Sequence, residues 1–589
     1  MARPPATRPG RSDLALAAVA LVAAAVFFAS LDRLWPLART DLHVPPAVLE
    51  ERARDFLLEA GFPVANHEAA SALKVDARVL DYLQRTFGRT EAQRLIAAGY
   101  PVYWYEVLFK RRGDPDRYWV HLGGSGAPGA SEAGDPAGEA GRVLGWGRSV
   151  QEDAPAGAVE EGEARDLALE TLGRHLGVVL DPAAPPEEVG GAEGGWREQG
   201  FYDQLRPERR DRYFVYQRHL SREPELRQRL VVIVSGDRVT GVDQSLVVPE
   251  AARRAARARK APMVALQTVG ILLAAAAVIG AFAVFLTRLR AGTARLAPAA
   301  RWIAVIGLCF LATQALRGHE LLAAWDPLWP RWIAALQTLA LAAAPAAWIL
   351  LVLFVVIAAG DALDREEARE EPRGASLWAL ARGRIASPAV GLASLRGFLV
   401  GLVCGGVLAG SILVLQALVG AWPPIQPQGF FFFALNSRAP LLATLLYFFM
   451  VALAEELAYR YFGGTFLLRA TGRRWLAVLV PAALYGLTHT GLEFLPPAEP
   501  FWGRAVVMTL VGCVWGWAYF RYDALTVVLS HFTADLFIFN WPRLGSGDPL
   551  LAAKAAAVIA VPLLPALLWG AGRSFRRERS GPPGRGPLV

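Results

Sequence analysis

Long apolar runs recur along the chain, and short segments rich in arginine or proline separate them. A helix needs about 20 apolar residues to cross a bilayer, so each run near or above that length predicts a membrane span. Hydropathy alone predicts about ten spans. They cover residues 14–31, 263–286, 302–316, 332–359, 389–420, 439–468, 475–490, 505–520, 524–540 and 551–570. The predicted fold class is a mostly α-helical, polytopic membrane bundle.

A polar region, residues 32–262, interrupts this pattern between the first two spans. Ala53 and Ala164 each open an amphipathic, helix-like stretch with the triplet Ala-Arg-Asp, and the stretches end at Gly61 and Gly173. Strand-like runs follow each stretch. They cover residues 103–110, 117–122 and 142–150 in the first copy, and 212–219, 228–235 and 238–248 in the second. The repetition predicts an α+β domain with an internal duplication, each copy a helix followed by three strands.

Composition agrees with a membrane protein, because hydrophobic residues make up 54% of the chain, against roughly 45–50% in soluble domains. The net charge of +8 comes from arginines that flank apolar runs rather than from one basic, aromatic-rich face. We therefore expect no nucleic-acid partner. The three cysteines all fall in apolar runs, so the polar region has no disulfide framework.

The distribution of arginine predicts how the chain crosses the membrane. Arginine-rich segments are the amino terminus, residues 288–301, 361–387 and 469–474, and the tail. The positive-inside rule places them in the cytoplasm, so both termini are cytoplasmic and residues 32–262 are extracytoplasmic. The first span is either a signal peptide or a retained anchor, and the lack of a clean cleavage site favours the anchor.

One basic tract, residues 253–260, opposes this assignment because it precedes the second span on the outer side. Long loops cross the membrane largely regardless of charge, so the other loops decide the topology. The tract is either a solvated helix face or a contact with anionic lipid headgroups.

These features divide the chain into five regions. They are a cytoplasmic amino terminus with its anchor (1–31), the extracytoplasmic α+β domain (32–262), transmembrane helices and loops (263–387), an intramembrane region with ionisable motifs (388–545), and a last span with a basic tail (546–589).

Ionisable side chains concentrate in three of the late spans. An ionised side chain in hydrocarbon costs at least about 2.5–3.5 kcal/mol on insertion scales, so such clusters are offset by pairing or by function. Of the eight histidines, only His489 and His531 lie in predicted spans. The motifs are Glu455-Glu456-x-x-x-Arg460, Tyr485-x-x-x-His489 and His531-x-x-x-Asp535.

Helix geometry predicts that these motifs meet at one depth. Measured along the helix, Glu455 lies about 20 Å from the arginine turn at residues 469–474, and His489 lies about as far beyond it. Glu456 and Arg460 have i,i+4 spacing and should pair on one face, which leaves Glu455 free to face the histidines. His531 and Asp535 share a face for the same reason.

In this order the three motifs resemble the CPBP intramembrane proteases, which include the Rce-type prenyl-protein CAAX endopeptidases and bacteriocin-processing or immunity relatives. The resemblance covers residues 388–543. It departs from the family pattern at Tyr485, where phenylalanine is frequent, and at Asp535, where the prenyl-protein enzymes have asparagine. The α+β domain is similar in pattern to PepSY-like modules of the outer side of bacterial membranes, without a diagnostic motif.

The protease resemblance implies an intramembrane endopeptidase of the bacterial cytoplasmic membrane that cleaves membrane-associated proteins or peptides among membrane lipids. Glu455 is the candidate general base for water. His489 and His531 either hold a divalent metal together with Glu455, for which zinc is favoured, or donate hydrogen bonds directly. Because an ionised Asp535 would repel an oxyanion, an active enzyme needs it protonated, bound to a metal, or orienting His531.

Two other classes of function remain open at this point. Intramembrane Glu–Arg and His–Asp pairs also serve as links between helices, as in a catalytically silent scaffold or immunity protein. A proton-coupled transporter is the other class, although no paired broken helices support it. Neither the substrate nor the oligomeric state follows from the sequence.

Overall fold

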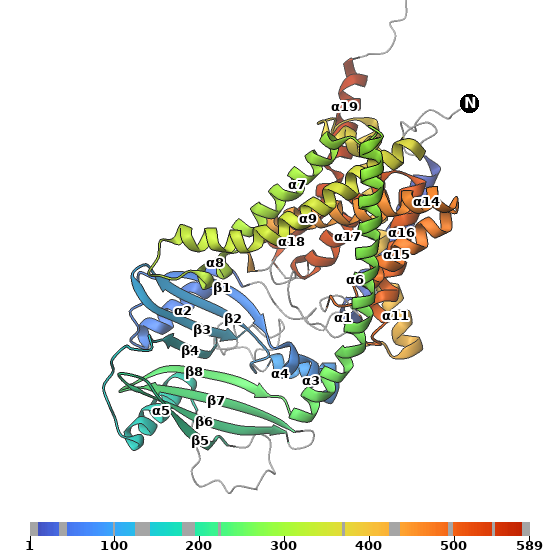
Figure 1. Cartoon of the computed structure of the whole chain (residues 1–589). Coiled ribbons are helices and arrows are strands. Elements are labelled where there is room, and N and C mark those ends of the chain that lie inside the picture. Colours follow the sequence, from blue (N-terminus) through green and yellow to red (C-terminus); the bar gives the residue numbers. More distant parts are fainter. Residues whose placement is uncertain are drawn as a thin grey trace, which may run out of the picture.

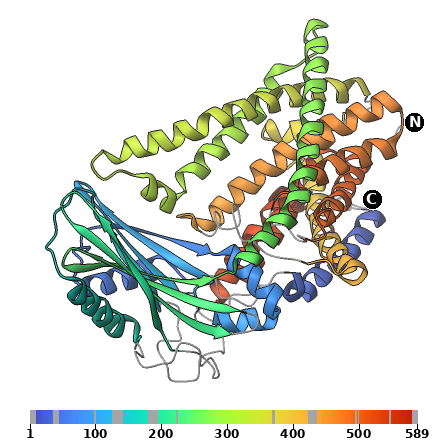
Figure 2. The same cartoon turned by 60° about the horizontal axis from the view of Figure 1, so that its bottom comes forward.

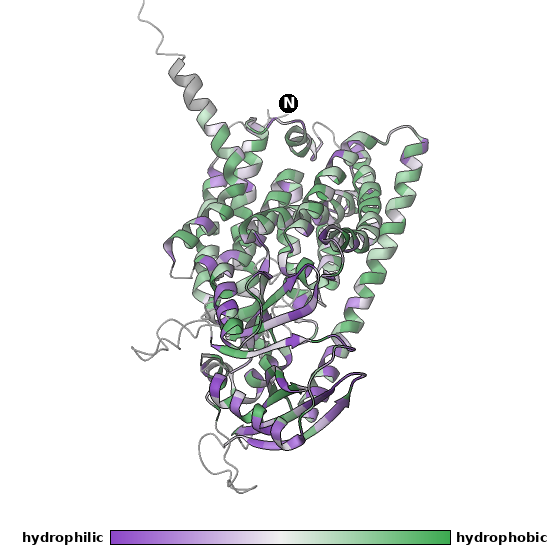
Figure 3. Ribbon diagram, turned by 90° about the vertical axis from the view of Figure 1, so that its left-hand side faces the viewer, coloured by the Kyte–Doolittle hydropathy of each residue, from purple (hydrophilic) through white to green (hydrophobic). Residues whose placement is uncertain are grey.

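The computed structural model describes residues 10–34, 44–97, 100–123, 142–178, 195–221, 225–367, 372–422, 436–492, 497, 499–544 and 548–579. A helical bundle forms one part of the molecule, and a single β-sheet with its helices lies at one end of the bundle (Figure 1). Apolar residues dominate the bundle, whereas polar residues are concentrated on the sheet (Figure 3).

Nine helical segments among the described residues are long and apolar enough to cross a membrane. They are α1 (Arg11–Leu34), α6 (Glu250–Arg290), α7 (Leu296–Ala315), α9 (Arg331–Glu367), α11 (Pro388–Val419), α13 with its continuation (Pro440–Thr471), α16 (Gly503–Arg521), α17 (Ala524–Leu544) and α18 with its continuation (Pro549–Ala571). The apolar helix α15 (Arg474–Thr488) is shorter, with 15 residues. Each span predicted from hydropathy coincides with one of these helices.

The predicted boundary after residue 262 falls inside a continuous helix. Helix α6 begins at Glu250 and runs from the sheet to the far end of the bundle (Figure 1). The basic tract therefore belongs to the first turns of α6 instead of the α+β domain. Within it, Arg259 lies 3.1 Å from Asp81 and 3.1 Å from Glu499, so part of the tract ties α6 to its neighbours.

Loops predicted to share one side of the membrane lie together at the end of the bundle opposite the sheet. Glu366, at the end of α9, lies 3.0 Å from Arg288 on α6 and 2.6 Å from Arg469. Arg396 on α11 pairs with Asp13 on α1 at 2.8 Å. These contacts agree with the predicted grouping of the loops. Which side faces the cytoplasm stays a prediction.

The sheet has eight antiparallel strands, which lie side by side in Figure 2. Their order across the sheet is β1 (Glu68–Val75), β2 (Tyr103–Arg111), β3 (Asp114–Gly123), β4 (Val143–Ser149), β8 (Arg238–Val247), β7 (Leu226–Ser235), β6 (Arg210–Ser221) and β5 (Arg197–Leu205). The prediction of three strands per copy was wrong by one, because β1 and β5 were missed. β1 is rich in alanine and β5 is almost entirely exposed, so neither shows the apolar alternation of a half-buried strand.

Each half of the sheet begins with a helix, α2 (Pro46–Glu59) or α5 (Glu161–Leu176). The two helices lie on the same face of the sheet, since Phe56 of α2 contacts His175 of α5 with ring centroids 5.6 Å apart. The predicted helix end at Gly173 is wrong, because α5 continues to Leu176 and is capped by Gly177, whose φ is 62°. The first half also contains α3 (Ala77–Phe87) and α4 (Arg89–Ala97). The duplication and the PepSY resemblance stay predictions.

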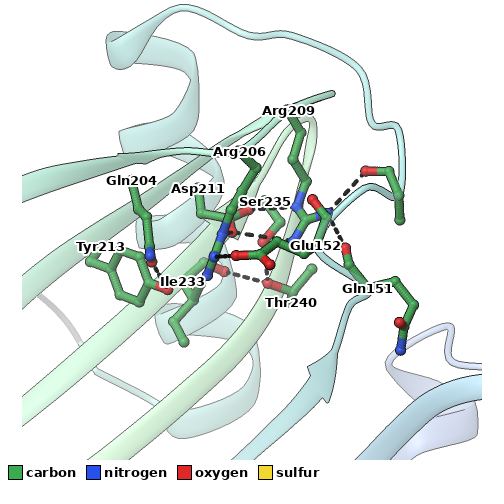
Figure 4. Close-up of polar contacts among 11 residues, drawn as sticks. Gln151, Glu152, Gln204, Arg206, Arg209, Asp211, Tyr213, Ile233, Ser235 and Thr240 are labelled. Atoms are coloured by element: carbon green, nitrogen blue, oxygen red, sulfur yellow. Dashed lines mark hydrogen bonds and ion pairs between the residues drawn. The ribbon is translucent and has the colours of Figure 1, made fainter.

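A buried polar network fixes the linker between β4 and α5 to the second half of the sheet (Figure 4). Arg209 pairs with Asp211 at 2.8 Å and donates hydrogen bonds to the carbonyls of Gln151 and Ala154. Burial would raise the pKa of Asp211, but its contacts with Arg209, Ser235 and Arg206 outweigh burial and lower it. The linker is thereby held against the β5–β6 turn.

Strand β2 joins the sheet to the helical part of the molecule. Its side chains alternate between the two faces, and Leu108 packs against Leu322 and Trp325 at the short helix α8 (Gly318–Ala324). Lys110 donates hydrogen bonds to the carbonyls of Ala323, at 2.8 Å, and Trp325. Burial lowers the pKa of Lys110 to about 8. The α+β domain is therefore docked on the bundle through its own sheet.

Candidate active site

The first motif lies where a regular α-helix changes to a π-helix. Helix α13 (Pro440–Glu456) continues directly into η2 (Leu457–Gly464), which is π-helical, and then into α14 (Thr465–Thr471). Single π-helical turns are rare and frequently occur at functional sites. Glu455 and Glu456 therefore precede an altered helical pitch, while Arg460 lies within it.

Glu456 is fully buried and holds two partners. Its Oε1 accepts a hydrogen bond from Arg460 Nη1 at 2.9 Å and a second from His531 Nδ1 at 2.8 Å. The sequence predicted the pairing with Arg460 but not the contact with His531. The carboxylate thus links the first motif to the third.

Aromatic rings surround the buried guanidinium of Arg460. Its central carbon lies 4.8 Å from the ring centroid of Tyr485, 5.1 Å from that of Trp515 and 5.7 Å from that of Tyr459. Arg460 also donates a hydrogen bond to the carbonyl of Gly512 at 3.3 Å. The negative ring faces and the hydrogen bonds offset the desolvation of the charge, which a planar guanidinium tolerates better than an ammonium.

Both histidines present the same ring nitrogen to Glu455. His489 donates from Nδ1 to the carbonyl of Tyr485 at 2.8 Å, and its Nε2 lies 3.7 Å from Glu455 Oε2. The Nε2 of His531 lies 3.9 Å from the same oxygen, and its ring stacks on Trp515 with centroids 4.1 Å apart. The predicted orientation of Glu455 toward the histidines agrees with this geometry.

Asp535 lies on a different side of His531 than the one expected for an orienting residue. Its Oδ2 is 3.4 Å from His531 Nε2, whereas the other ring nitrogen already donates to Glu456. Glu456 therefore holds the ring. Asp535 instead faces the same space as Glu455.

The structure brings together all six residues predicted for the site, namely Glu455, Glu456, Arg460, His489, His531 and Asp535. Trp515 and Tyr459 were missed. A single aromatic residue in an apolar span is ordinary, so the sequence offered no signal for either. Their positions beside Arg460 and His531 depend on how the helices pack.

Two cavities meet at Glu455. The inner chamber has a volume of about 90 Å³ and is lined by Glu455, His489, His531 and Asp535 among others. One water molecule needs about 10–15 Å³ of such space, so the chamber has room for several. The outer cavity has a volume of about 850 Å³. Glu455, Tyr447 and Val451 line both, so the glutamate stands at the junction.

The donor set is chemically suited to a divalent cation, although its spacing forms no metal site. Both histidines turn Nδ1 to an acceptor, as metal-bound imidazoles do. Glu455 Oε2 is buried without a hydrogen-bond partner. Within the part of the chain that the structure describes, no group of three or more His, Cys, Asp or Glu side chains is arranged to hold a metal ion. Zinc stays a prediction.

Comparison with known families identifies the segment that carries this site. Residues 437–537 match the family model described as type II CAAX prenyl endopeptidase Rce1-like. The segment is similar to this family and is named the Rce1-like segment. The match confirms the resemblance to CPBP proteases that the three motifs predicted, and the Rce1-like segment contains every predicted site residue. Searches among curated proteins and among solved structures gave no match. The α+β domain lies outside the Rce1-like segment.

Proposed function

We propose that this chain is an intramembrane endopeptidase that hydrolyses peptide bonds of membrane-associated proteins or peptides. One observation carries the proposal: Glu455, His489 and His531 surround a chamber of about 90 Å³ inside an Rce1-like segment. The apolar helices around this chamber support an integral membrane protein. No observation on the described residues favours the silent scaffold or the transporter.

Glu455 is the base that activates water in this proposal. Its Oε2 is buried, has no hydrogen-bond partner and faces both histidines, so a water molecule in the chamber can donate a proton to it. The water oxygen forms a bond to the carbonyl carbon of the substrate. When the C–N bond breaks, Glu455 returns the proton to the amine that leaves.

The histidines have different roles, because their partners differ. His489 donates a hydrogen bond from Nδ1 to the carbonyl of Tyr485. In the neutral ring, Nε2 then carries a lone pair, which accepts a hydrogen bond from the water and orients it. His531 lies among three carboxylates, and its protonated form presents an Nε2–H group to the developing oxyanion. A proton shared with Asp535 removes the repulsion that an aspartate would otherwise exert.

Arg460 and Trp515 are positioning residues in this scheme. Arg460 holds Glu456, which accepts a hydrogen bond from the edge of the His531 ring, while Trp515 stacks on a face of that ring. The arrangement fixes His531 Nε2 toward the chamber. Such supporting contacts decide how closely a catalytic group keeps its productive geometry.

A metal ion is the alternative means of activating the water. His489, His531 and Glu455 would hold it, and a bound divalent ion would lower the pKa of water to about 7 and polarise the substrate carbonyl.

Comparative membrane proteomics tests the proposed function. Cells that express Glu455→Gln should accumulate an uncleaved membrane protein that wild-type cells process. Glu250→Gln, an exposed change at the start of α6, is the matched control and should behave as wild type. If Glu455→Gln cells retain the wild-type pattern of membrane proteins, the protease function is wrong.

A further inference from the structure

The outer cavity connects the sheet with the proposed catalytic glutamate. Residues from β1, α7, α8, α9 and α13 line its volume of about 850 Å³. Leu73, Lys74 and Val75 of β1 belong to the same lining as Glu455. Along α13, Glu455 lies about 22 Å from Pro440, which begins the helix beside the sheet. The α+β domain therefore forms part of the cavity that leads to the candidate active site.

The cavity changes from polar to apolar with depth. Near the sheet, its lining includes Lys74, Gln314, Arg317 and Glu320. Deeper in the bundle the wall is apolar, and its residues include Ile306, Phe310, Leu350, Leu353 and Met450. We call the polar end of the cavity, beside the sheet, its mouth. An occupant that matches these walls has an apolar stretch next to Glu455 and a polar flank at the mouth.

At the sheet end of the cavity, the outer edge of β1 already holds a peptide-like group. β1 is an edge strand whose one neighbour among the described strands is β2. On its other edge, the Asn436 carboxamide accepts a hydrogen bond from the Leu73 N–H at 2.7 Å and donates one to the Leu73 carbonyl at 3.2 Å. A neighbouring strand makes the same pair of bonds, so this edge recognises extended backbone.

We propose that the substrate reaches Glu455 through the outer cavity as an extended, apolar polypeptide segment that lies alongside β1 at the mouth. The inference rests on the proposed protease function. A helical segment keeps its backbone bonds internal and offers none to an edge strand, which favours an extended occupant. An extended chain covers about 3.3 Å per residue, so about seven residues separate the mouth from the cleaved bond.

The cavity can be blocked without touching the catalytic groups. Ala346 on α9 lines the outer cavity, whereas Ala347, the next residue, is exposed on the outside of the bundle. The probe is a set of internally quenched peptides with seven to nine apolar residues and a charged flank at either end. Ala346→Trp in lipid nanodiscs should lower kcat/KM for the cleaved probe by about tenfold or more. The matched variant Ala347→Trp should leave it unchanged.

Photocross-linking tests the route without cleavage. A photoreactive residue replaces Val75, which lines the cavity, or Tyr202 on β5, the opposite edge of the same sheet, in the Glu455→Gln background. The same peptide probes should form adducts at position 75 and not at position 202. Absence of adducts at position 75, or equal adducts at both positions, overturns the route whether or not the probes are cleaved.

The two experiments separate failure of the route from failure of the proposed function. If Glu455→Gln cleaves the probes as fast as wild type, the catalytic assignment fails, while adducts at position 75 still support the route. If wild type cleaves them and a folded Ala346→Trp cleaves them equally fast, the route through this cavity is wrong. Thermal melting of Ala346→Trp in nanodiscs shows whether the variant is folded.

Discussion

Glu455 and Glu456 are adjacent in the sequence but differ in environment. The side chain of Glu456 is 0% exposed and bonded to Arg460 and His531, whereas that of Glu455 is 27% exposed and lines both cavities. A buried ion pair that loses one partner leaves an uncompensated charge. In the proposed mechanism, Glu456 therefore has a structural role and its neighbour Glu455 a chemical one.

Substitutions should separate these roles. Glu456→Ala and Arg460→Ala should each lower the free energy of unfolding by about 3–5 kcal/mol, because each strands a buried charge. Glu455→Gln should give a folded but inactive protein. Yield after size-exclusion chromatography and the Tm in detergent measure the first effect. An Arg460→Ala variant with the wild-type Tm would contradict the pairing.

Whether cleavage requires a metal ion depends on whether the two histidines bind one or form hydrogen bonds to the water and the substrate. If His489 and His531 bind zinc through Nε2, purified active protein should contain about one metal ion per chain, chelation should abolish cleavage, and zinc should restore it. His489→Ala should lose metal and activity together, while His219→Ala, on strand β6 of the sheet, should lose neither. If metal-depleted protein cleaves at an undiminished rate, the metal scheme is wrong and the scheme in which Glu455 alone activates water remains.

Local spacing was sufficient to predict the contacts within one helix but not those between helices. The i,i+4 rule gave Glu456 with Arg460 and His531 with Asp535. The bond between His531 and Glu456 depends on the rotation of α17 relative to α13, which no pattern in either helix encodes. The spacing therefore could not predict that Glu456, and not Asp535, contacts His531 Nδ1.

Small residues set how closely α11 approaches α17. Gly397, Gly401 and Gly405 are spaced four apart on α11, and each lies against α17. A Cβ on Gly401 would stand 2.5 Å from the Cβ of Thr533, two residues after His531. Close approach through small residues is the usual way in which membrane helices gain packing contacts.

Gly401→Ala should therefore displace α17 and with it the His531 ring. Overpacking of this kind costs about 1–3 kcal/mol, so we expect a lower Tm and reduced cleavage. Gly410→Ala is the matched control on the same helix, because a Cβ there would meet nothing within 4 Å. Equal Tm and activity in the two variants would show that the close approach is not needed.

Charged groups at the docked face of the sheet make its stability depend on pH. His121 lies 3.5 Å from Glu106 on β2 and 3.6 Å from Asp243 on β8, and His319 of α8 lies 3.1 Å from Glu106. Burial would lower the pKa of His121, but its contacts with Asp243 and Glu106 outweigh burial and raise it. Burial would raise the pKa of Glu106, but the two histidines and Lys74 hold it well below its usual value.

Stability should therefore fall as the pH rises above neutral. A raised folded-state pKa means that the contribution of His121 is fully present below its unfolded value of about 6.5 and is lost as pH rises through the folded value. We expect the Tm of wild type in nanodiscs to decrease as the pH rises above about 6.5. His121→Gln should make the Tm decrease less steeply with pH, because the contribution of His121 is removed. A slope unchanged by His121→Gln would contradict the assignment.

Elements with strong periodicity were predicted well and those without it were missed. The strands after each helix agree with the predicted runs within a few residues, since their residues alternate between two faces. β5 offers no such pattern, because almost all of its residues are exposed, and only pairing with β6 defines it. The π-helical turn η2 likewise has no signature in the sequence.

The sheet and the bundle form one structure. β1 contributes to the outer cavity and β2 binds the end of α8, so the α+β domain shapes the space in front of Glu455. The sequence predicted both parts but not their contact, because residues such as Lys110 and Trp325 are 215 positions apart and meet only in the folded chain.

The two ends of the bundle should lie on opposite sides of the membrane. The start of α6 lies beside the sheet, whereas α19 (Leu564–Arg579), which continues α18, lies at the far end with the arginine-rich loops (Figure 1). A reporter fused after Pro249 should therefore be extracytoplasmic, and one fused after Arg577 should be cytoplasmic. Both reporters on one side would overturn the predicted number of spans.

The same pair of reporters also decides from which side substrates arrive. If both locations are reversed, the arrangement of helices stands, but the sheet and the mouth of the outer cavity face the cytoplasm. If the prediction holds, the mouth faces away from the cytoplasm, because β1 lines it. Peptides added to sealed, inverted vesicles should then be cleaved only after the membrane is permeabilised, whereas right-side-out vesicles should cleave them directly.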